Sequence, residues 1–234
     1  MECIILAGGM GTRLQSVVSD VPKCMAPVAG HPFLHYLITT LIEAGFKHII
    51  LSLGYKHEII GEWLGANRFS ADISTVVEEV PLGTGGAVKL ALSKVRTENV
   101  FVLNGDTFFG LNYPELLNLH RQTSASATLA LKRMEKFSRY GVVDIEQESR
   151  RILRFNEKQY CESGLINGGI YLINRNELDG YPAKFSLEKD FFEAKVTTSI
   201  LSGYISEGYF IDIGIPDDYA QAQTDFKDGR YKAL

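Results

Sequence analysis

The chain has 234 residues, 45% of them hydrophobic, and a formal net charge of −4. This length and hydrophobic content predict one sizeable core, so we expect a single catalytic or binding domain covering residues 1–234. The acidic balance argues against nucleic-acid binding, and no apolar stretch approaches the length of a membrane span. Three widely spaced cysteines form neither a zinc-binding pair nor a disulfide framework, so we expect a cytoplasmic protein.

The first predicted element is a buried strand that ends in glycines. Residues 3–7 are a short apolar run rich in isoleucine, and Gly8, Gly9 and Gly11 follow it. Glycines at the carboxyl end of a strand let the backbone approach a ligand with its amide groups exposed. Arg13 and Lys23 add positive charge nearby. We therefore predict a site for a polyanion such as a nucleoside triphosphate, with a tight turn that binds nothing as the alternative.

The glycine loop matches neither of two common phosphate-binding motifs. The dinucleotide fingerprint needs a third glycine where Leu14 stands, and the P-loop needs a Gly-Lys-Ser/Thr sequence that is absent. These mismatches disfavour an NAD-dependent oxidoreductase.

The next hundred residues alternate between helix-like and strand-like patterns. Apolar residues recur at the helical period over 33–44, where Gly45 follows, and similar patterns predict helices at 57–64 and 85–95. Short β-branched or apolar runs predict strands at 48–53, 73–77 and 100–103. This alternation predicts a mainly parallel sheet covered on both faces.

The second half of the chain changes character. Short strands are predicted at 127–132, 140–145, 152–155 and 165–173, with few helices between them, and helical patterns return at 187–194 and 216–226. We expect these strands to add antiparallel members to the same sheet. The predicted fold class is α/β, a Rossmann-like three-layer sandwich with a mainly parallel mixed sheet and a small antiparallel addition, with the substrate between the two halves.

Two apolar segments end in an aspartate. Asp106 follows the strand at 100–103, and Asp212 ends a similar run at 209–211. A carboxylate there is costly to desolvate, so we expect it to be paired or metal-bound. The two aspartates could meet over one cation, for which Mg²⁺ is the natural choice with oxygen ligands. The alternative is that each aspartate caps a following turn.

The loop from Gly8 to Leu14, followed by Pro22-Lys23, resembles the signature of the sugar-1-phosphate nucleotidyltransferases. That resemblance implies the reaction of a nucleoside triphosphate with a sugar 1-phosphate to give a nucleotide sugar and pyrophosphate. It implies catalytic roles for Arg13, Lys23 and Asp106, and Mg²⁺ ligation by Asp106 and Asp212. It also implies that the nucleotide is bound by Leu6, Ala7, Gly8, Gly9, Gly11, Thr12, Arg13 and Asp106.

Further motifs match the sugar-phosphate side of this family. Phe155 to Lys158 resembles the segment in which a lysine meets the phosphate and a glutamate meets sugar hydroxyls. By itself that pair of charges would suit a solvent-exposed surface. Tyr140-Gly141, Asn167-Gly168-Gly169 and the acidic segment at 186–190 resemble other family segments beside the sugar. The resemblance therefore implies sugar-phosphate binding by Gly141, Glu157, Lys158, Asn167, Gly168 and Glu188.

Base choice is predicted from Glu78. Gly83 and Thr84 begin a segment that resembles the family's nucleoside-binding glycine motif, and Glu78 stands where the family presents a side chain to the base edge. An ionised carboxylate only accepts hydrogen bonds, and guanine offers two adjacent donors whereas uracil offers one. Glu78 therefore favours GTP, unless it is simply a solvated acid at a strand end.

Within the family, the chain resembles the guanylyltransferases that act on D-glycero-α-D-manno-heptose 1-phosphate for bacterial surface glycans. Mannose-1-phosphate guanylyltransferases and short uridylyltransferases are the alternatives, and a non-catalytic nucleotide-sugar sensor is the alternative from another class. We expect GTP, a sugar 1-phosphate and Mg²⁺ as partners, without nucleic acid or membrane. The oligomeric state is left open, with a homo-oligomer as one alternative.

Overall fold

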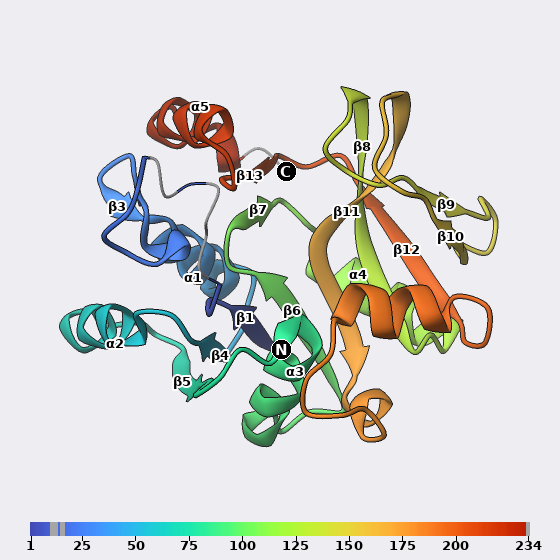
Figure 1. Cartoon of the computed structure of the whole chain (residues 1–234), viewed down its shortest axis with the longest axis horizontal. Helices are drawn as coiled ribbons and strands as arrows, with labels where there is room; N and C mark the ends of the chain where they lie inside the picture. Colours follow the sequence, from blue (N-terminus) through green and yellow to red (C-terminus); the bar gives the residue numbers. More distant parts are fainter. Residues whose placement is uncertain (10–13, 15–16, 233–234) are drawn as a thin grey trace.

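The computed structural model describes residues 1–9, 14 and 17–232. Its centre is a seven-stranded sheet in the order β12-β8-β11-β6-β1-β4-β5 (Figure 1). Strands β1, β4, β5 and β6 pair parallel, β11 runs antiparallel to both β6 and β8, and β12 runs parallel to β8. The mainly parallel mixed sheet is thus confirmed. The strands are β1 (Glu2–Leu6), β4 (His48–Leu53), β5 (Asp72–Val77), β6 (Asn99–Asn104), β8 (Ala127–Phe137), β11 (Cys161–Asn174) and β12 (Leu201–Ser206).

Both faces of this sheet are buried, because alternate residues of each strand enter different cores. In β1, Cys3 and Ile5 pack with residues of α1, α4 and α5, whereas Ile4 packs on the opposite face with residues of α3. Two helical layers therefore enclose the sheet, as expected for a three-layer sandwich. The α-helices are α1 (Phe33–Glu43), α2 (His57–Ala66), α3 (Gly83–Ala91), α4 (Tyr113–Thr123) and α5 (Pro216–Lys227).

Shorter elements complete the fold. A π-helix, η4 (Leu187–Glu193), packs against α3. Short 3₁₀-helices are η1 (Lys23–Met25), η2 (Leu92–Lys94), η3 (Arg175–Leu178) and η5 (Arg230–Lys232). Three antiparallel pairs are β2 (Pro27–Val28) with β3 (His31–Pro32), β7 (Thr107–Phe109) with β13 (Phe210–Asp212), and β9 (Val143–Ile145) with β10 (Ile152–Phe155).

The second half of the chain departs from prediction in three places. Helix α4 was not predicted, although Asn112 caps it by accepting a hydrogen bond from the Glu115 amide. Strand β12 was also missed. The strand predicted at 140–145 begins only at Val143, and it pairs with β10 in a separate two-stranded sheet instead of extending the main one.

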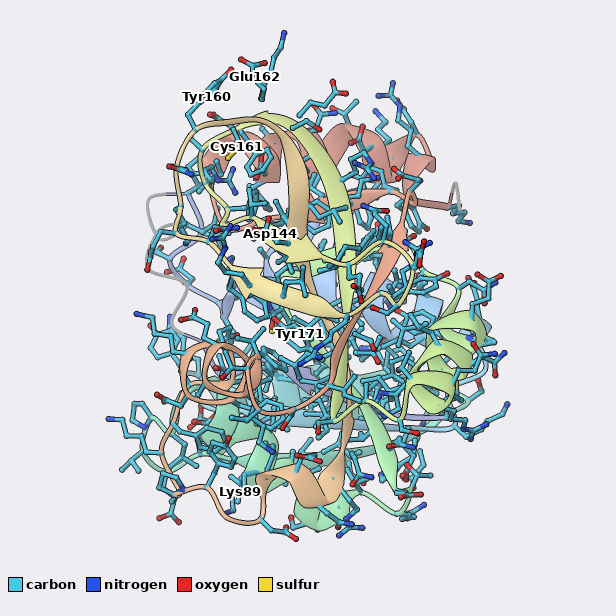
Figure 2. All side chains as sticks on the ribbon, turned by 90° about the vertical axis from the view of Figure 1, so that its right-hand side faces the viewer. Lys89, Asp144, Tyr160, Cys161, Glu162 and Tyr171 are labelled. Atoms are coloured by element: carbon cyan, nitrogen blue, oxygen red, sulfur yellow. The ribbon has the colours of Figure 1, made fainter. Side chains whose placement is uncertain are left out.

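In the described part of the chain, no helix combines the length and apolar character that crossing a membrane would require. Figure 2 shows Tyr171 of β11 near the centre of the molecule, where it is buried, while Tyr160 and Glu162 project at the edge, at the start of the same strand.

Candidate active site

A cavity of about 1070 Å³ opens at the carboxyl ends of the parallel strands. Leu6 ends β1 and Ala7 to Gly9 follow it, Gly54 follows β4, and Glu78 follows β5. Asn104 ends β6 and Gly105-Asp106 follow it, and all of these residues line the cavity. Open parallel sheets bind ligands at this edge, where loops from several strands meet. Of the residues predicted to bind nucleotide, the lining includes Leu6, Ala7, Gly8, Gly9, Glu78, Gly83, Thr84 and Asp106.

Three charged side chains meet at one end of this cavity. The Lys23 ammonium contacts the Asp106 carboxylate and lies 3.6 Å from Oδ1 of Asp212. Only 10% of the Lys23 side chain is exposed, so the ammonium is largely withdrawn from water. Lys23 is also the only lysine or arginine among the described residues that line the cavity. The two acidic strand ends thus converge on a single cationic group.

The pairing of β7 with β13 brings the two aspartates together. Asp212 lies opposite Thr107, and the Ile213 amide donates to the carbonyl oxygen of Asp106 at 3.0 Å. The Gly214 amide then donates to Oδ1 of Asp212 at 2.8 Å. A Cβ at Gly214 would lie 2.7 Å from that oxygen and 2.8 Å from Lys23 Nζ, so a larger residue here would displace the Asp212 and Lys23 side chains.

The arrangement of carboxylates fits a divalent cation. Burial and the negative charge of Asp106 raise the pKa of the Asp212 carboxyl, against the opposing effects of Lys23 and Arg139. A cation bound between the carboxylates would relieve this repulsion. Within the described residues, no third acidic, histidine or cysteine side chain joins them in a metal-binding group. Two protein oxygens that leave places for water and phosphate are typical of Mg²⁺.

A cysteine in the cavity wall is unsuited to covalent catalysis. Cys24 is buried, and burial together with the Asp106 charge raises the pKa of its thiol to about 12. The thiol therefore stays protonated at neutral pH, and a thiolate nucleophile is not formed.

Glu78 follows β5, the edge strand of the sheet, whereas Asp106 follows β6, three positions away in the strand order. Its Oε2 accepts a hydrogen bond from the Leu82 amide at 3.0 Å. Its Oε1 faces Gly8, where an added Cβ would approach within 3.0 Å. One oxygen is therefore fixed by the backbone, and the side chain is held over the glycine loop.

Glu188 belongs to the same cavity as the predicted nucleotide-binding residues. Its Oε2 accepts from the Thr84 hydroxyl at 2.6 Å and from the Ser186 hydroxyl at 3.0 Å. The Leu187 amide donates to the Thr84 hydroxyl at 2.9 Å. These bonds join the start of α3 to the start of the π-helix and fix Thr84 against Glu188.

Asn167 is held within an irregular part of β11. Its Oδ1 accepts from the Gly169 amide at 2.9 Å, and its Nδ2 donates to the Tyr171 hydroxyl at 3.1 Å. The pairing with β8 shifts register here, and Gly169 has a φ of 73°, which favours glycine. The bulge thus fixes the direction of the Asn167 amide.

The remaining predicted sugar-site residues lie away from the cavity lining. Gly141 packs against the backbone of Asn156, where a Cβ would lie 2.3 Å from the carbonyl oxygen. Gly168 packs against the Phe109 ring. Glu157 and Lys158 are exposed, and neither lines the cavity. The predicted residues Gly11, Thr12 and Arg13 lie outside the described residues.

Sequence reasoning missed two features of the site. Asn104, the last residue of β6, lines the cavity two residues before Asp106. Arg139 lies 3.8 Å from Oδ2 of Asp212 and 2.6 Å from Asp218, and its pKa is raised by these contacts despite the opposing effect of burial. The only signal for Arg139 was its position directly before Tyr140-Gly141.

Comparisons with known proteins agree with this geometry. The family profile described as nucleotidyl transferase matches residues 2–229. The chain is 47% identical to D-glycero-alpha-D-manno-heptose 1-phosphate guanylyltransferase of Aneurinibacillus thermoaerophilus, with 97% of this chain and 99% of that protein covered. It is 32% identical to mannose-1-phosphate guanylyltransferase of Mycobacterium tuberculosis, with 98% of this chain and 65% of that protein covered.

A solved structure shows the same fold. HddC from Yersinia pseudotuberculosis, complexed with GMP-PN, superposes with a TM-score of 0.87 at 37% identity, covering 97% of this chain and 99% of that one. The profile match and these relatives both extend over nearly the whole chain, which therefore belongs to the nucleotidyl transferase family.

Proposed function

We propose that this protein transfers a guanylyl group from GTP to a sugar 1-phosphate, D-glycero-α-D-manno-heptose 1-phosphate, and releases pyrophosphate. The observation that carries the proposal is the similarity to a heptose 1-phosphate guanylyltransferase over nearly the full length of both chains. A carboxylate, Glu78, at the edge of the cavity supports the choice of a guanine base.

In this reaction an oxygen of the sugar phosphate attacks the α-phosphorus of GTP in line with the leaving group. A phosphorus–oxygen bond forms to the sugar phosphate, the bond to the β-phosphate breaks, and pyrophosphate leaves. No enzyme nucleophile is required, in keeping with a protonated Cys24 thiol. Catalysis then depends on positioning the two phosphates and on stabilising their charge.

Lys23 supplies positive charge at the reacting centre. Its ammonium is held by Asp106 and lies near Asp212, and Lys23 lines the same cavity as Gly8 and Gly9. A withdrawn ammonium stabilises developing negative charge more strongly than an exposed one. Asp106 and Asp212 would hold Mg²⁺, which acts as a Lewis acid toward phosphate oxygens when bound. Arg13 is proposed to draw charge from pyrophosphate, and Lys158 to hold the sugar phosphate.

The sugar itself would be bound by the second half of the chain. We assign this role to Gly141, Glu157, Asn167, Gly168 and Glu188, and assign nucleoside contacts to Gly83 and Thr84. Because Thr84 donates to Glu188, the two substrate regions share a hydrogen bond. All three cysteines are free thiols, which suits the reducing cytoplasm in which we place the reaction.

The proposal is tested by product analysis. The protein is incubated with GTP, Mg²⁺ and one sugar phosphate at a time, namely heptose, mannose or glucose 1-phosphate, and the products are identified by mass spectrometry. We expect GDP-heptose and pyrophosphate as the main products. A GDP-mannose product at a higher kcat/KM would establish the mannose alternative, for which the 32% identical relative is the supporting observation. The absence of any GDP-sugar would overturn the proposal.

A further inference from the structure

Arg139 joins two segments that lie far apart in the sequence. It belongs to the loop between β8 and β9, directly before Tyr140-Gly141. Its Nη1 donates to Oδ2 of Asp218, in the first turn of α5, at 2.6 Å. Its Nη2 lies 3.8 Å from Oδ2 of Asp212, at the end of β13. One guanidinium therefore connects the loop before β9 to both ends of the β13–α5 turn.

Arg139 faces Oδ2 of Asp212, which is not the oxygen that faces Lys23. Oδ1 of Asp212 accepts from the Gly214 amide and faces Lys23, whereas Oδ2 faces Arg139. The two oxygens thus face two different cationic side chains. Rotation of the carboxylate about its Cβ–Cγ bond would change the contacts of both oxygens, so Arg139 favours the orientation in which Oδ1 faces Lys23.

Arg139 also fixes its neighbour Tyr140. Its Nη2 donates to the Tyr140 hydroxyl at 3.1 Å, and its guanidinium lies 5.3 Å from the centroid of the Tyr140 ring. The Tyr140 ring meets Phe210 of β13 edge-on, with centroids 6.2 Å apart. The Tyr140-Gly141 segment therefore packs on β13 through the contact of Tyr140 with Phe210 and through Arg139. Phe210 lies two residues before Asp212 in β13.

We propose that Arg139 is a positioning residue that couples the Tyr140-Gly141 segment to the orientation of Asp212. This inference rests on the proposed function, in which Gly141 lies beside the sugar and Asp212 beside the reacting phosphates. Breaking the Arg139–Asp218 pair releases the loop from α5 and weakens sugar-phosphate binding. It leaves the nucleotide cavity intact, because neither Arg139 nor Asp218 lines it.

The contribution of the Arg139–Asp218 ion pair to folding free energy decides which measurement is informative. The Arg139 and Asp218 side chains are about one-third exposed, at 33% and 32%. Partly exposed pairs contribute little to folding free energy. A substitution that breaks this pair should therefore leave thermal stability nearly unchanged, and any marked effect on one substrate alone reports positioning.

The test compares Asp218→Asn, Arg139→Gln, Arg139→Lys and the double variant Arg139→Gln/Asp218→Asn. The matched control is Asp228→Asn, which removes an acid paired with Arg230 at 3.5 Å at the other end of α5. Initial rates of pyrophosphate release are measured while GTP and heptose 1-phosphate are varied in turn. The same series with mannose 1-phosphate is run in parallel.

For Asp218→Asn we expect the KM of the sugar phosphate to rise about threefold to tenfold, with the KM of GTP nearly unchanged. Arg139→Gln should raise the same KM and also lower kcat, because Oδ2 of Asp212 loses the cationic group that it faces. Arg139→Lys keeps the charge but cannot bond Asp218 and Tyr140 through one planar group, so it should restore kcat more fully than KM. The double variant should be no worse than Arg139→Gln.

Additive losses in the double variant, equal changes in both KM values, or the same change in Asp228→Asn would each overturn the coupling. A wild type that releases no pyrophosphate from GTP refutes the proposed function instead. In that case the affinities for each sugar phosphate and for GTP are measured by calorimetric titration, and they test the coupling. Weaker sugar-phosphate binding in Asp218→Asn than in wild type supports it, and equal or undetectable binding in both overturns it.

Discussion

Asp106 and Asp212 face the same ammonium group, that of Lys23, although Asp106 lies between β6 and β7 and Asp212 ends β13, far along the chain. The antiparallel pairing of β7 with β13 brings them together, and the Ile213 amide bonds to the Asp106 carbonyl oxygen across that pair. Neighbouring carboxylates repel each other, and the positive charge of Lys23 between them offsets part of that repulsion.

The first prediction concerns these two carboxylates. Asp106→Asn or Asp212→Asn should lower kcat at least about 100-fold, because each removes an anionic ligand for Mg²⁺. Chelation with EDTA should abolish turnover of the wild type, and added Mg²⁺ should restore it. Circular dichroism and melting temperature check that each variant is folded. A folded variant with wild-type kcat at saturating Mg²⁺ would remove its aspartate from the metal site.

The second prediction separates two lysines. Lys23 is 10% exposed between two carboxylates, whereas Lys158 is exposed outside the cavity lining. Lys23→Ala should mainly lower kcat, because its charge acts at the reacting centre. Lys158→Ala should mainly raise the KM of the sugar phosphate. Steady-state kinetics with each substrate varied in turn measure both effects, and an unchanged sugar-phosphate KM in Lys158→Ala would assign Lys158 to the solvent-exposed surface.

The third prediction concerns stability. Glu2 is buried in β1, where it accepts hydrogen bonds from His48, the Thr97 hydroxyl and the Arg96 and Thr97 amides. Burial raises its pKa, but these bonds outweigh burial and lower it to about 2. The folded pKa lies below the unfolded value, so the stabilisation is complete above the unfolded pKa and is lost as pH falls toward 2.

Glu2→Gln should therefore cost about 1–3 kcal/mol of unfolding free energy at neutral pH, with a smaller cost in acid. Urea unfolding of both proteins at several pH values between 7 and 3 measures the difference. A difference that is independent of pH would show that the Glu2 charge does not contribute.

The fourth prediction concerns Glu78. Its Oε2 accepts from the Leu82 amide, and its other oxygen faces Gly8. Glu78→Gln keeps the shape of the side chain but replaces one acceptor with a donor. The kcat/KM for GTP should fall by the equivalent of about 1–3 kcal/mol, and the difference from UTP should narrow. An unchanged GTP preference in this variant would show that another group selects the base.

The fold of the first half could be predicted from the sequence because its signals are local. Each apolar run of 3–7, 48–53 and 100–103 is a strand of the sheet, and Gly45 follows the end of α1. Helix α4 was missed because only Tyr113, Leu116 and His120 of its residues are buried, so its apolar stripe is narrow. Its Asn112 cap and Pro114 were signals that could have found it.

Sheet partners and side-chain contacts in the second half depend on tertiary structure. The parallel pairing of β12 with β8 and the separation of β9 from the main sheet follow from packing, which no local pattern encodes. The convergence of Asp106 and Asp212 was anticipated as one alternative, because both follow apolar strands. The link between Arg139 and Asp218 was not, because surface ion pairs carry no characteristic spacing.

The most direct test of guanylyl transfer is a comparison of kcat/KM for GTP, UTP, CTP and ATP with heptose 1-phosphate as the common acceptor. A site with paired hydrogen bonds rejects bases that leave its polar groups unpaired. We expect GTP to be preferred over each of the other nucleotides by about 100-fold or more. A preference for UTP, or comparable values for all four nucleotides, would contradict it.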